Sequence, residues 1–133
     1  MNTPEISIIM PNYNCASYVG EAISSIQSQD FYNWELIVID DCSTDTSFEI
    51  IRELASSDSR ILLLKNSSRQ GPGAARNVGL KNSRGRFIAF LDSDDYVTKD
   101  WLKDFYKKAK KNSPDFVFCD MKKMDIDSKQ EKV

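Results

Sequence analysis

Three carboxylates, Asp92, Asp94 and Asp95, directly follow the apolar run 87–91. A buried strand that ends in this way delivers its acids to the edge of a sheet. Asp92 and Asp94 are two positions apart, so both can point at one place from a turn, and carboxylate oxygens are the ligands that Mg²⁺ and Mn²⁺ prefer. Short acidic segments also cap helices and fill solvated turns, so only its surroundings make this motif a predicted site for a divalent cation.

Two earlier apolar runs also end in polar residues. The run 6–10 leads into the turn 11–14, and the run 34–39 leads into Asp40 and Asp41. In parallel α/β sheets, ligands bind outside the carboxyl ends of the strands. We therefore expect the polar segments after all three runs to open on one edge of a sheet.

Apolar runs alternate with segments of helical periodicity along the chain. Strands are expected at 6–10, 34–39, 61–64, from Phe87 and at 116–119, and helices at 19–26, after a capping box at 46–49, at 74–82 and at 102–112. This alternation implies βαβ units with right-handed crossovers and a largely parallel sheet. The prediction is an α/β fold with one domain over residues 1–120, followed by a polar, aperiodic tail at 121–133 that is compatible with disorder.

Composition excludes several classes of protein. The net charge is −2, with 18 basic and 20 acidic residues, and it lacks the basic excess typical of nucleic-acid binding. Cys15, Cys42 and Cys119 have no metal-ligand spacing, and the absence of histidine excludes a Ser-His pair. No leader pattern begins the chain and no apolar run could span a bilayer, so we expect a cytoplasmic protein.

Common phosphate-binding loops fit the sequence poorly. The turn 11–14 lacks the glycines of a dinucleotide fold, and no Walker motif occurs. The segment 71–76, Gly-Pro-Gly-Ala-Ala-Arg, either approaches a ligand or simply forms a tight turn and a helix start. What remains is an aromatic residue after the first strand, acids after the second and a metal-competent pair after the fourth, which suits a nucleotide diphosphate bridged by a cation.

Four segments, 7–14, 35–45, 73–77 and 90–95, resemble in order the signatures of family 2 glycosyltransferases. The resemblance spans nearly all of residues 5–120. It implies a GT-A fold, a Rossmann-like sheet flanked by helices, and an inverting transfer from a nucleotide-sugar, commonly a UDP-sugar, to a glycan or lipid-linked acceptor in polysaccharide biosynthesis.

The resemblance also implies roles for residues near the nucleotide. Pro11 and Tyr13 would border it, Asp41 would accept a hydrogen bond from the base, and Asp40 would support or share that contact. Tyr13 could stack on the base or pack its loop against the sheet. Cys42 stands where the family often has glycine, which leaves the local turn geometry open.

By the same resemblance, Asp92 and Asp94 form the Asp-x-Asp motif that binds Mn²⁺ or Mg²⁺, with Asp94 favoured as the direct ligand. A cation bridging both phosphates neutralises the charge on the leaving diphosphate. Arg76 could contact phosphate, or it could be a solvated or aspartate-paired helix residue.

No catalytic base is assigned. Surface solvation is the default for the downstream acids Asp115, Asp120, Asp125 and Asp127. The resemblance implies that the base and the acceptor pocket lie beyond the nucleotide-binding half, so we expect either a truncated chain or a reduced form of the enzyme.

Two other functions stay open. A module that binds a nucleotide-sugar without transfer would carry the same residues. A haloacid-dehalogenase-type phosphatase is less favoured, because Tyr96 occupies the threonine position of its motif and only 38 residues follow Asp95.

Lysines 103, 107, 108, 110 and 111 gather toward the end of the fourth expected helix. They could contact a membrane surface, although cations near a helix C-terminus usually lie in water. An exposed sheet edge would also give the chain a physical reason to form a homodimer.

Overall fold

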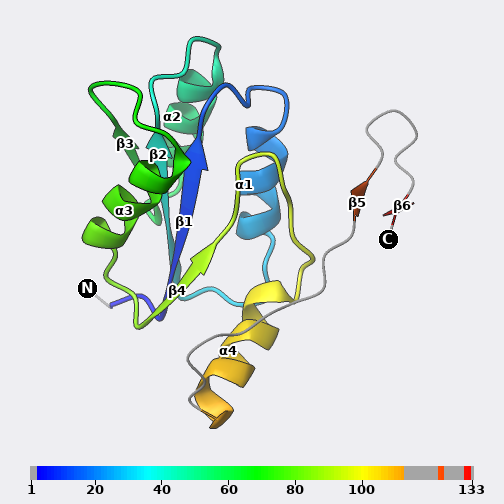
Figure 1. The fold of residues 1–133 in the computed structure, drawn as a ribbon. Helices are drawn as coiled ribbons and strands as arrows, with labels where there is room; N and C mark the ends of the chain where they lie inside the picture. The colour runs from blue at the N-terminus through cyan, green and yellow to red at the C-terminus, as the bar shows by residue number, and fades with distance from the viewer. Residues whose placement is uncertain (1–2, 113–122, 125–130, 133) are drawn as a thin grey trace.

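The computed structural model describes residues 3–112, 123–124 and 131–132. Its centre is a sheet of four parallel strands in the order β3-β2-β1-β4 (Figure 1). The strands are β1 (Ile6–Asn12), β2 (Trp34–Asp40), β3 (Ile61–Lys65) and β4 (Phe87–Phe90). All four run in the same direction, so the polar segments after them share one edge, as predicted. Within the described residues, no strand pairs with the outer side of β4, and homodimer formation there stays a prediction.

Helices cover both faces of the sheet (Figure 1). They are α1 (Val19–Gln27), α2 (Ser47–Ser57), α3 (Pro72–Asn82) and α4 (Trp101–Asn112). Side chains alternate between the faces of a strand, and β1 shows this directly. Its Ile6, Ile8 and Met10 pack with α1, α2 and α4, whereas Ile9 packs with Ala75 of α3. The predicted α/β fold is confirmed.

Helix α3 lies close to the sheet because its inner face is made of small residues. A Cβ atom at Gly79 would lie 2.5 Å from Cγ2 of Ile9 and 2.9 Å from Cδ1 of Ile39. Both are side-chain atoms, so any side chain at position 79 would force Ile9 and Ile39 to shift. One turn earlier on the same face, Ala75 is fully buried.

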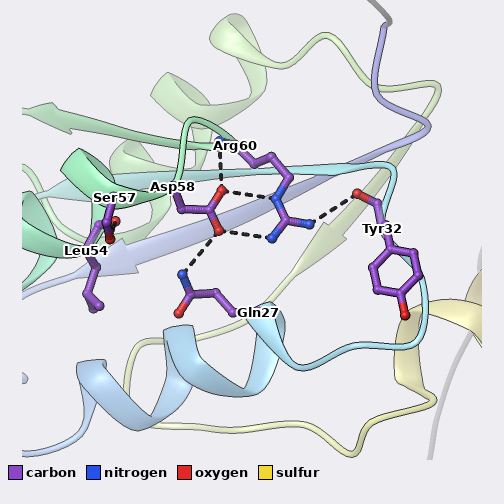
Figure 2. A network of polar contacts seen from close by, with 6 residues as sticks. All are labelled: Gln27, Tyr32, Leu54, Ser57, Asp58 and Arg60. Atoms are coloured by element: carbon purple, nitrogen blue, oxygen red, sulfur yellow. Dashed lines mark hydrogen bonds and ion pairs between the residues drawn. The ribbon is translucent and has the colours of Figure 1, made fainter.

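The amino edge of the sheet is closed by two polar networks. In the first, the Asp58 carboxylate accepts hydrogen bonds from Nε and Nη2 of Arg60, each at 3.0 Å, and from Nε2 of Gln27 at 3.1 Å (Figure 2). In the second, Glu35 accepts from Ser7 Oγ at 2.6 Å and from the backbone N–H of Arg84 at 2.7 Å.

Helix α4 packs at this same amino edge. The centre of its Tyr106 ring lies 4.8 Å from the centre of the ring of Phe31, which precedes β2. It lies 6.0 Å from the centre of the ring of Phe87, the first residue of β4. The lysine-rich end of α4 therefore lies away from the edge where the strands end (Figure 1).

Most of the predicted elements are confirmed, with differences at their ends. On the faces that helical periodicity turns inward, Val19, Ala22, Ile23 and Ile26 of α1 and Ile51 of α2 are buried, and Leu54 and Ala55 of α2 are partly buried against the same core. The capping box at 46–49 is wrong, because Thr46 makes no side-chain cap bond and Asp45 instead accepts the backbone N–H of Ser47 at 2.9 Å. Helix α3 begins at Pro72 rather than Ala74, since the fixed φ of proline suits the first turn of a helix.

The end of the chain is described only in part. The strand expected at 116–119 lies outside the described residues. Within the segment predicted as a polar tail, β5 (Lys123–Met124) and β6 (Glu131–Lys132) pair as a short antiparallel ladder. Among the described residues, no helix has the length and apolar character needed to cross a bilayer.

Candidate functional site

A cleft of about 310 Å³ opens at the carboxyl edge of the sheet. It is lined by Pro11, Asn12, Tyr13, Cys15, Asp41, Arg69, Pro72, Ala75, Arg76, Asp92, Ser93 and Asp94. Of the residues predicted for the site, all line this cleft except Asp40. Segments following β1, β2, β3 and β4 thus meet in one place.

Asp41 forms part of the cleft floor and anchors the loop before α3. Its Oδ1 accepts from Asn66 Nδ2 at 3.0 Å and from the backbone N–H of Gln70 at 2.9 Å, and its Oδ2 accepts from the N–H of Gly71 at 2.8 Å. Burial acts to raise the pKa of Asp41, but these hydrogen bonds and the nearby charge of Arg69 outweigh it and hold the pKa below its usual value. Asp41 therefore stays ionised.

Asp40 lies beneath the cleft and is fully buried. Its Oδ1 accepts from Asn12 Nδ2 at 2.9 Å and from Ser43 Oγ at 2.6 Å, and its Oδ2 accepts from the N–H of Ser43 at 3.1 Å. A ligand in the cleft cannot reach this carboxylate directly. Of the two roles expected for Asp40, supporting its neighbour and sharing the base contact, the burial favours support.

The turn after β2 contains a residue in the left-handed region. Cys42 has a φ of 64°, a conformation for which glycine is the usual choice. Its Sγ lies 3.1 Å from the backbone oxygen of Asn66 and so ties the turn to the neighbouring loop. The turn thus has left-handed geometry at the position where the resemblance favours glycine over cysteine.

The loops after β1 and β2 are joined to each other. Asn14, whose φ is 50°, accepts the N–H of Thr44 on its Oδ1 at 2.8 Å. In return, Oδ2 of Asp45 accepts the N–H of Ala16 at 3.0 Å. These contacts make the floor of the cleft a cross-linked unit.

The acids after β4 have a different environment. One carboxylate oxygen from each of Asp92, Asp94 and Asp95 lies within 4.8 Å of the others, and all three residues are exposed. Partial desolvation raises the pKa of Asp95, and the charges of Asp94 and Asp92 raise it further. Like charges gathered this closely fit a divalent cation, for which carboxylates are suitable ligands. Asp95 thus lies beside the two residues predicted from sequence as metal ligands.

Arg76 is paired with one of these acids. Its Nη2 lies 3.2 Å from Oδ1 of Asp92, and the two side chains are 38% and 51% exposed. The structure thus shows the aspartate-paired arrangement, one of the two predicted for Arg76. An ion pair this exposed is weak, so Asp92 can exchange its partner.

Sequence reasoning did not single out Arg69. Its guanidinium carbon lies 3.6 Å above the centre of the Tyr13 ring. Arg69 belongs to a polar loop without a recognised motif, so only its position between a strand and the Gly71 turn could have drawn attention to it.

Asn12 lines the cleft and has an unusual amide group. Its Nδ2 donates to Asp40 and to Ser47 Oγ, the latter at 3.0 Å, and this orients the amide. Its Oδ1 is buried and has no hydrogen-bond partner within the described part of the chain. The amide nitrogen therefore stabilises the floor of the cleft, whereas the amide oxygen has an unused acceptor position.

A second hollow, of about 430 Å³, lies at the amino edge and is lined by Trp34, Arg60 and Arg84 among others. Each of these arginines already pairs with an acid: Arg60 with Asp58 at 3.0 Å and Arg84 with Glu35 at 3.1 Å. Although this hollow is larger, its charges are matched within the protein. The cleft at the carboxyl edge is the better candidate for a charged ligand.

Comparison with known proteins finds relatives of this chain in both sequence and fold. The family model described as "Glycosyl transferase family 2" matches residues 7–132. The chain is 46% identical over 114 residues to the Escherichia coli UDP-Glc:alpha-D-GlcNAc-diphosphoundecaprenol beta-1,3-glucosyltransferase WfgD, a match that covers 85% of this chain and 44% of WfgD.

Two solved structures are similar in both fold and sequence. Staphylococcus aureus TarS 1–349 in complex with UDP-GlcNAc aligns with a TM-score of 0.77 and 36% identity, over 82% of this chain and 32% of that one. The mannosyltransferase PcManGT from Pyrobaculum calidifontis, in complex with GDP-Man and Mn²⁺, aligns with a TM-score of 0.76 and 26% identity, over 84% and 34%. The chain thus spans less than half the length of each of these three proteins.

Proposed function

Because this chain belongs to glycosyl transferase family 2, we propose that its cleft binds the nucleotide-sugar donor of a glycosyltransferase, a UDP-sugar, together with a divalent cation. One observation carries the proposal. Asp41, which follows β2, and Asp92 and Asp94, which follow β4, line the same cleft although about 50 residues separate them in sequence.

The nucleobase of the donor would lie at the side of the cleft formed by Pro11, Tyr13 and Asp41. A carboxylate oxygen can accept about two hydrogen bonds. Oδ1 of Asp41 already accepts two, whereas Oδ2 accepts one, from Gly71. Oδ2 therefore has room for one donor, such as a ring N–H of a base, and the ring of Tyr13 offers a stacking surface.

The cation would be held by Asp92 and Asp94, with Asp94 as the direct ligand and Asp95 beside them. When bound, it would supply Lewis-acid stabilisation of the charge that develops on the leaving diphosphate. Mn²⁺ and Mg²⁺ need only one or two carboxylates in addition to phosphate oxygens and water. Arg76 would be free to turn toward phosphate once a cation neutralises Asp92.

Neither the acceptor site nor the catalytic base is assigned to residues of this cleft. We propose an inverting transfer to a glycan or lipid-linked acceptor, in line with the diphosphoundecaprenol-linked substrate in the name of WfgD. The catalytic base would come from a segment beyond the nucleotide-binding half, since such relatives are longer than this chain. Helix α4 lies at the opposite edge of the sheet from the cleft, so membrane contact through its lysines would not bring a lipid-linked acceptor to the donor.

The test is calorimetry of UDP binding with and without Mn²⁺, comparing the unmodified chain with Asp94→Asn. We expect Mn²⁺ to strengthen UDP binding by at least tenfold, and we expect Asp94→Asn to remove most of this gain. The physical reason is that the variant loses the charge that holds the cation against the phosphates. Asp104→Asn removes the same charge from an exposed position on α4 and is the matched control.

Metal-independent UDP binding that is insensitive to Asp94→Asn would overturn the proposal. Hydrolysis of a UDP-sugar, measured in the same samples, separates two forms of it. Slow hydrolysis supports an enzyme, whereas binding without any turnover supports the nucleotide-sugar-binding module.

A further inference from the structure

We propose that Arg69 occupies the base-stacking face of Tyr13 in the free protein, and that an arriving nucleobase displaces it. This inference rests on the proposed function, because it concerns the same cleft. It adds a residue that sets which ligands the cleft prefers, namely nucleotides over nucleosides.

The first support is the geometry of the stack. The guanidinium carbon of Arg69 lies 3.6 Å above the centre of the Tyr13 ring. A guanidinium is planar and stacks on aromatic faces, so at this distance it fills the space that a flat base would need. Both side chains line the cleft, so the covered face is the one that a ligand would use.

The second support is the way the loop around Arg69 is held. The two residues after it, Gln70 and Gly71, donate their backbone N–H groups to Asp41 at 2.9 and 2.8 Å. Gly71 has a φ of 94°, a value that favours glycine. The backbone is thus anchored while the Arg69 side chain is exposed, so exchange requires only a change of rotamer.

The charge of Arg69 gives the exchange its selectivity. A cation–π contact at an exposed site contributes about 0.5–1 kcal/mol, which corresponds to about a two- to fivefold reduction in affinity for any ring that must displace it. An uncharged nucleoside has no phosphate to pair with the released guanidinium, so nothing offsets this reduction in its affinity. A nucleoside diphosphate can recover it, because the released guanidinium stays in the cleft and can pair with phosphate.

The experiment compares the dissociation constants of uridine and UDP, at the same Mn²⁺ concentration, for the unmodified chain and for Arg69→Ala. We expect the variant to bind uridine about two- to fivefold more tightly and UDP no more tightly than before, so its preference for UDP over uridine falls. Arg52→Ala removes the same charge from an exposed position on α2, outside the cleft, and should leave both constants unchanged.

Nuclear magnetic resonance of the arginine side chains supplies a direct readout. The Arg69 side-chain protons should show an upfield ring-current shift that disappears in Tyr13→Leu and on addition of uridine. If Arg69→Ala binds uridine equally or more weakly, or if uridine leaves the shift in place, the displacement is wrong. If neither protein binds uridine or UDP, the proposed function itself has failed.

Discussion

The acidic residues at the two edges of the central sheet differ in burial and in how their charges are paired. At the amino edge, Glu35 and Asp58 are largely buried and each is matched by an arginine, Arg84 and Arg60. At the carboxyl edge, Asp92, Asp94 and Asp95 are exposed and face one another. Acids matched within the protein stabilise the fold, whereas acids held together against their mutual repulsion leave charge available for a ligand.

The same contrast occurs within the carboxyl edge. Asp40 and Asp41 receive their hydrogen bonds from the loops they join. Asp40 is fully buried, whereas Asp41 lines the cleft and its Oδ2 accepts a single protein hydrogen bond. Asp92 has a single exposed arginine partner in the described part of the chain. The protein donors around an acid that follows a strand, together with its burial, therefore decide how much of its carboxylate is left for a ligand: none in Asp40, part of it in Asp41 and most of it in Asp92.

The largest effect that we predict is at the amino edge, for Gly85→Ala. A Cβ atom there would lie 2.5 Å from the backbone nitrogen of Ser7 and 2.9 Å from the carbonyl carbon of Ile6. Because these are backbone atoms, they cannot move aside as a flexible side chain could. We expect the free energy of unfolding, measured with urea, to fall by about 3 kcal/mol.

Gly20→Ala is the matched control, because a Cβ atom at Gly20 meets nothing within 4 Å. It lies in helix α1, where alanine has the higher helix propensity, and should raise stability by about 0.5–1 kcal/mol. Equal effects of the two substitutions would show that the amino edge is not closely packed.

The order of elements and the meeting of their ends could be predicted from sequence. An element that is buried shows a local pattern in the sequence, such as the β-branched run at 34–39 and the helical periodicity at 19–26. Once the strands are parallel, the shared edge follows from topology alone. For this reason the amino-acid sequence could predict that Tyr13, Asp41 and Asp94 lie at one edge of the sheet, and in the structure all three line the same cleft.

The hydrogen-bond partners of the site could not be predicted. Asp40 and Asp41 are adjacent and chemically identical, yet one faces Asn12 and Ser43 while the other faces Gln70 and Gly71. Side chains alternate across a strand, but the loops that supply their donors come from distant parts of the chain. Arg69 escaped notice for the same reason, because its partner Tyr13 lies 56 residues away and no local pattern links them.

The second prediction applies the same chemical change, carboxylate to amide, to both edges. Glu35→Gln should lower the free energy of unfolding by about 2 kcal/mol, because the buried group loses its charge-assisted bonds to Ser7 and Arg84. Asp94→Asn should change it by less than about 0.5 kcal/mol, since an exposed acid among like charges loses little that stabilises the fold.

Urea unfolding at neutral pH without divalent cations measures both variants. Adding Mn²⁺ should then stabilise the Glu35→Gln protein but not the Asp94→Asn protein, because a ligand that binds only the folded state raises its stability. If Asp94→Asn were the more destabilising of the two, the distinction between the edges would be wrong.

The smallest effect concerns pH and the Asp58 network (Figure 2). Hydrogen bonds from Arg60 are the main cause that lowers the pKa of Asp58 from 3.8 to about 2, with Gln27 adding to it and burial acting in the opposite direction. A carboxyl group whose pKa is lower in the folded state stabilises the fold at pH values above its unfolded pKa. The stabilisation then falls as the pH decreases from about 4 toward 2.

Because Arg60 is 34% exposed and water screens the pair, we expect this contribution to be between about 1 and 2 kcal/mol at neutral pH. Asp58→Asn should therefore be less stable than the unmodified chain by that amount at pH 6, and the gap should narrow by about half at pH 3, as measured by urea unfolding at each pH. Asp104→Asn controls for the loss of one negative charge. A gap that stayed constant from pH 6 to pH 3 would mean that Asp58 contributes through packing and neutral hydrogen bonds rather than through its charge, and the amino edge would then owe its stability to shape rather than to matched ions.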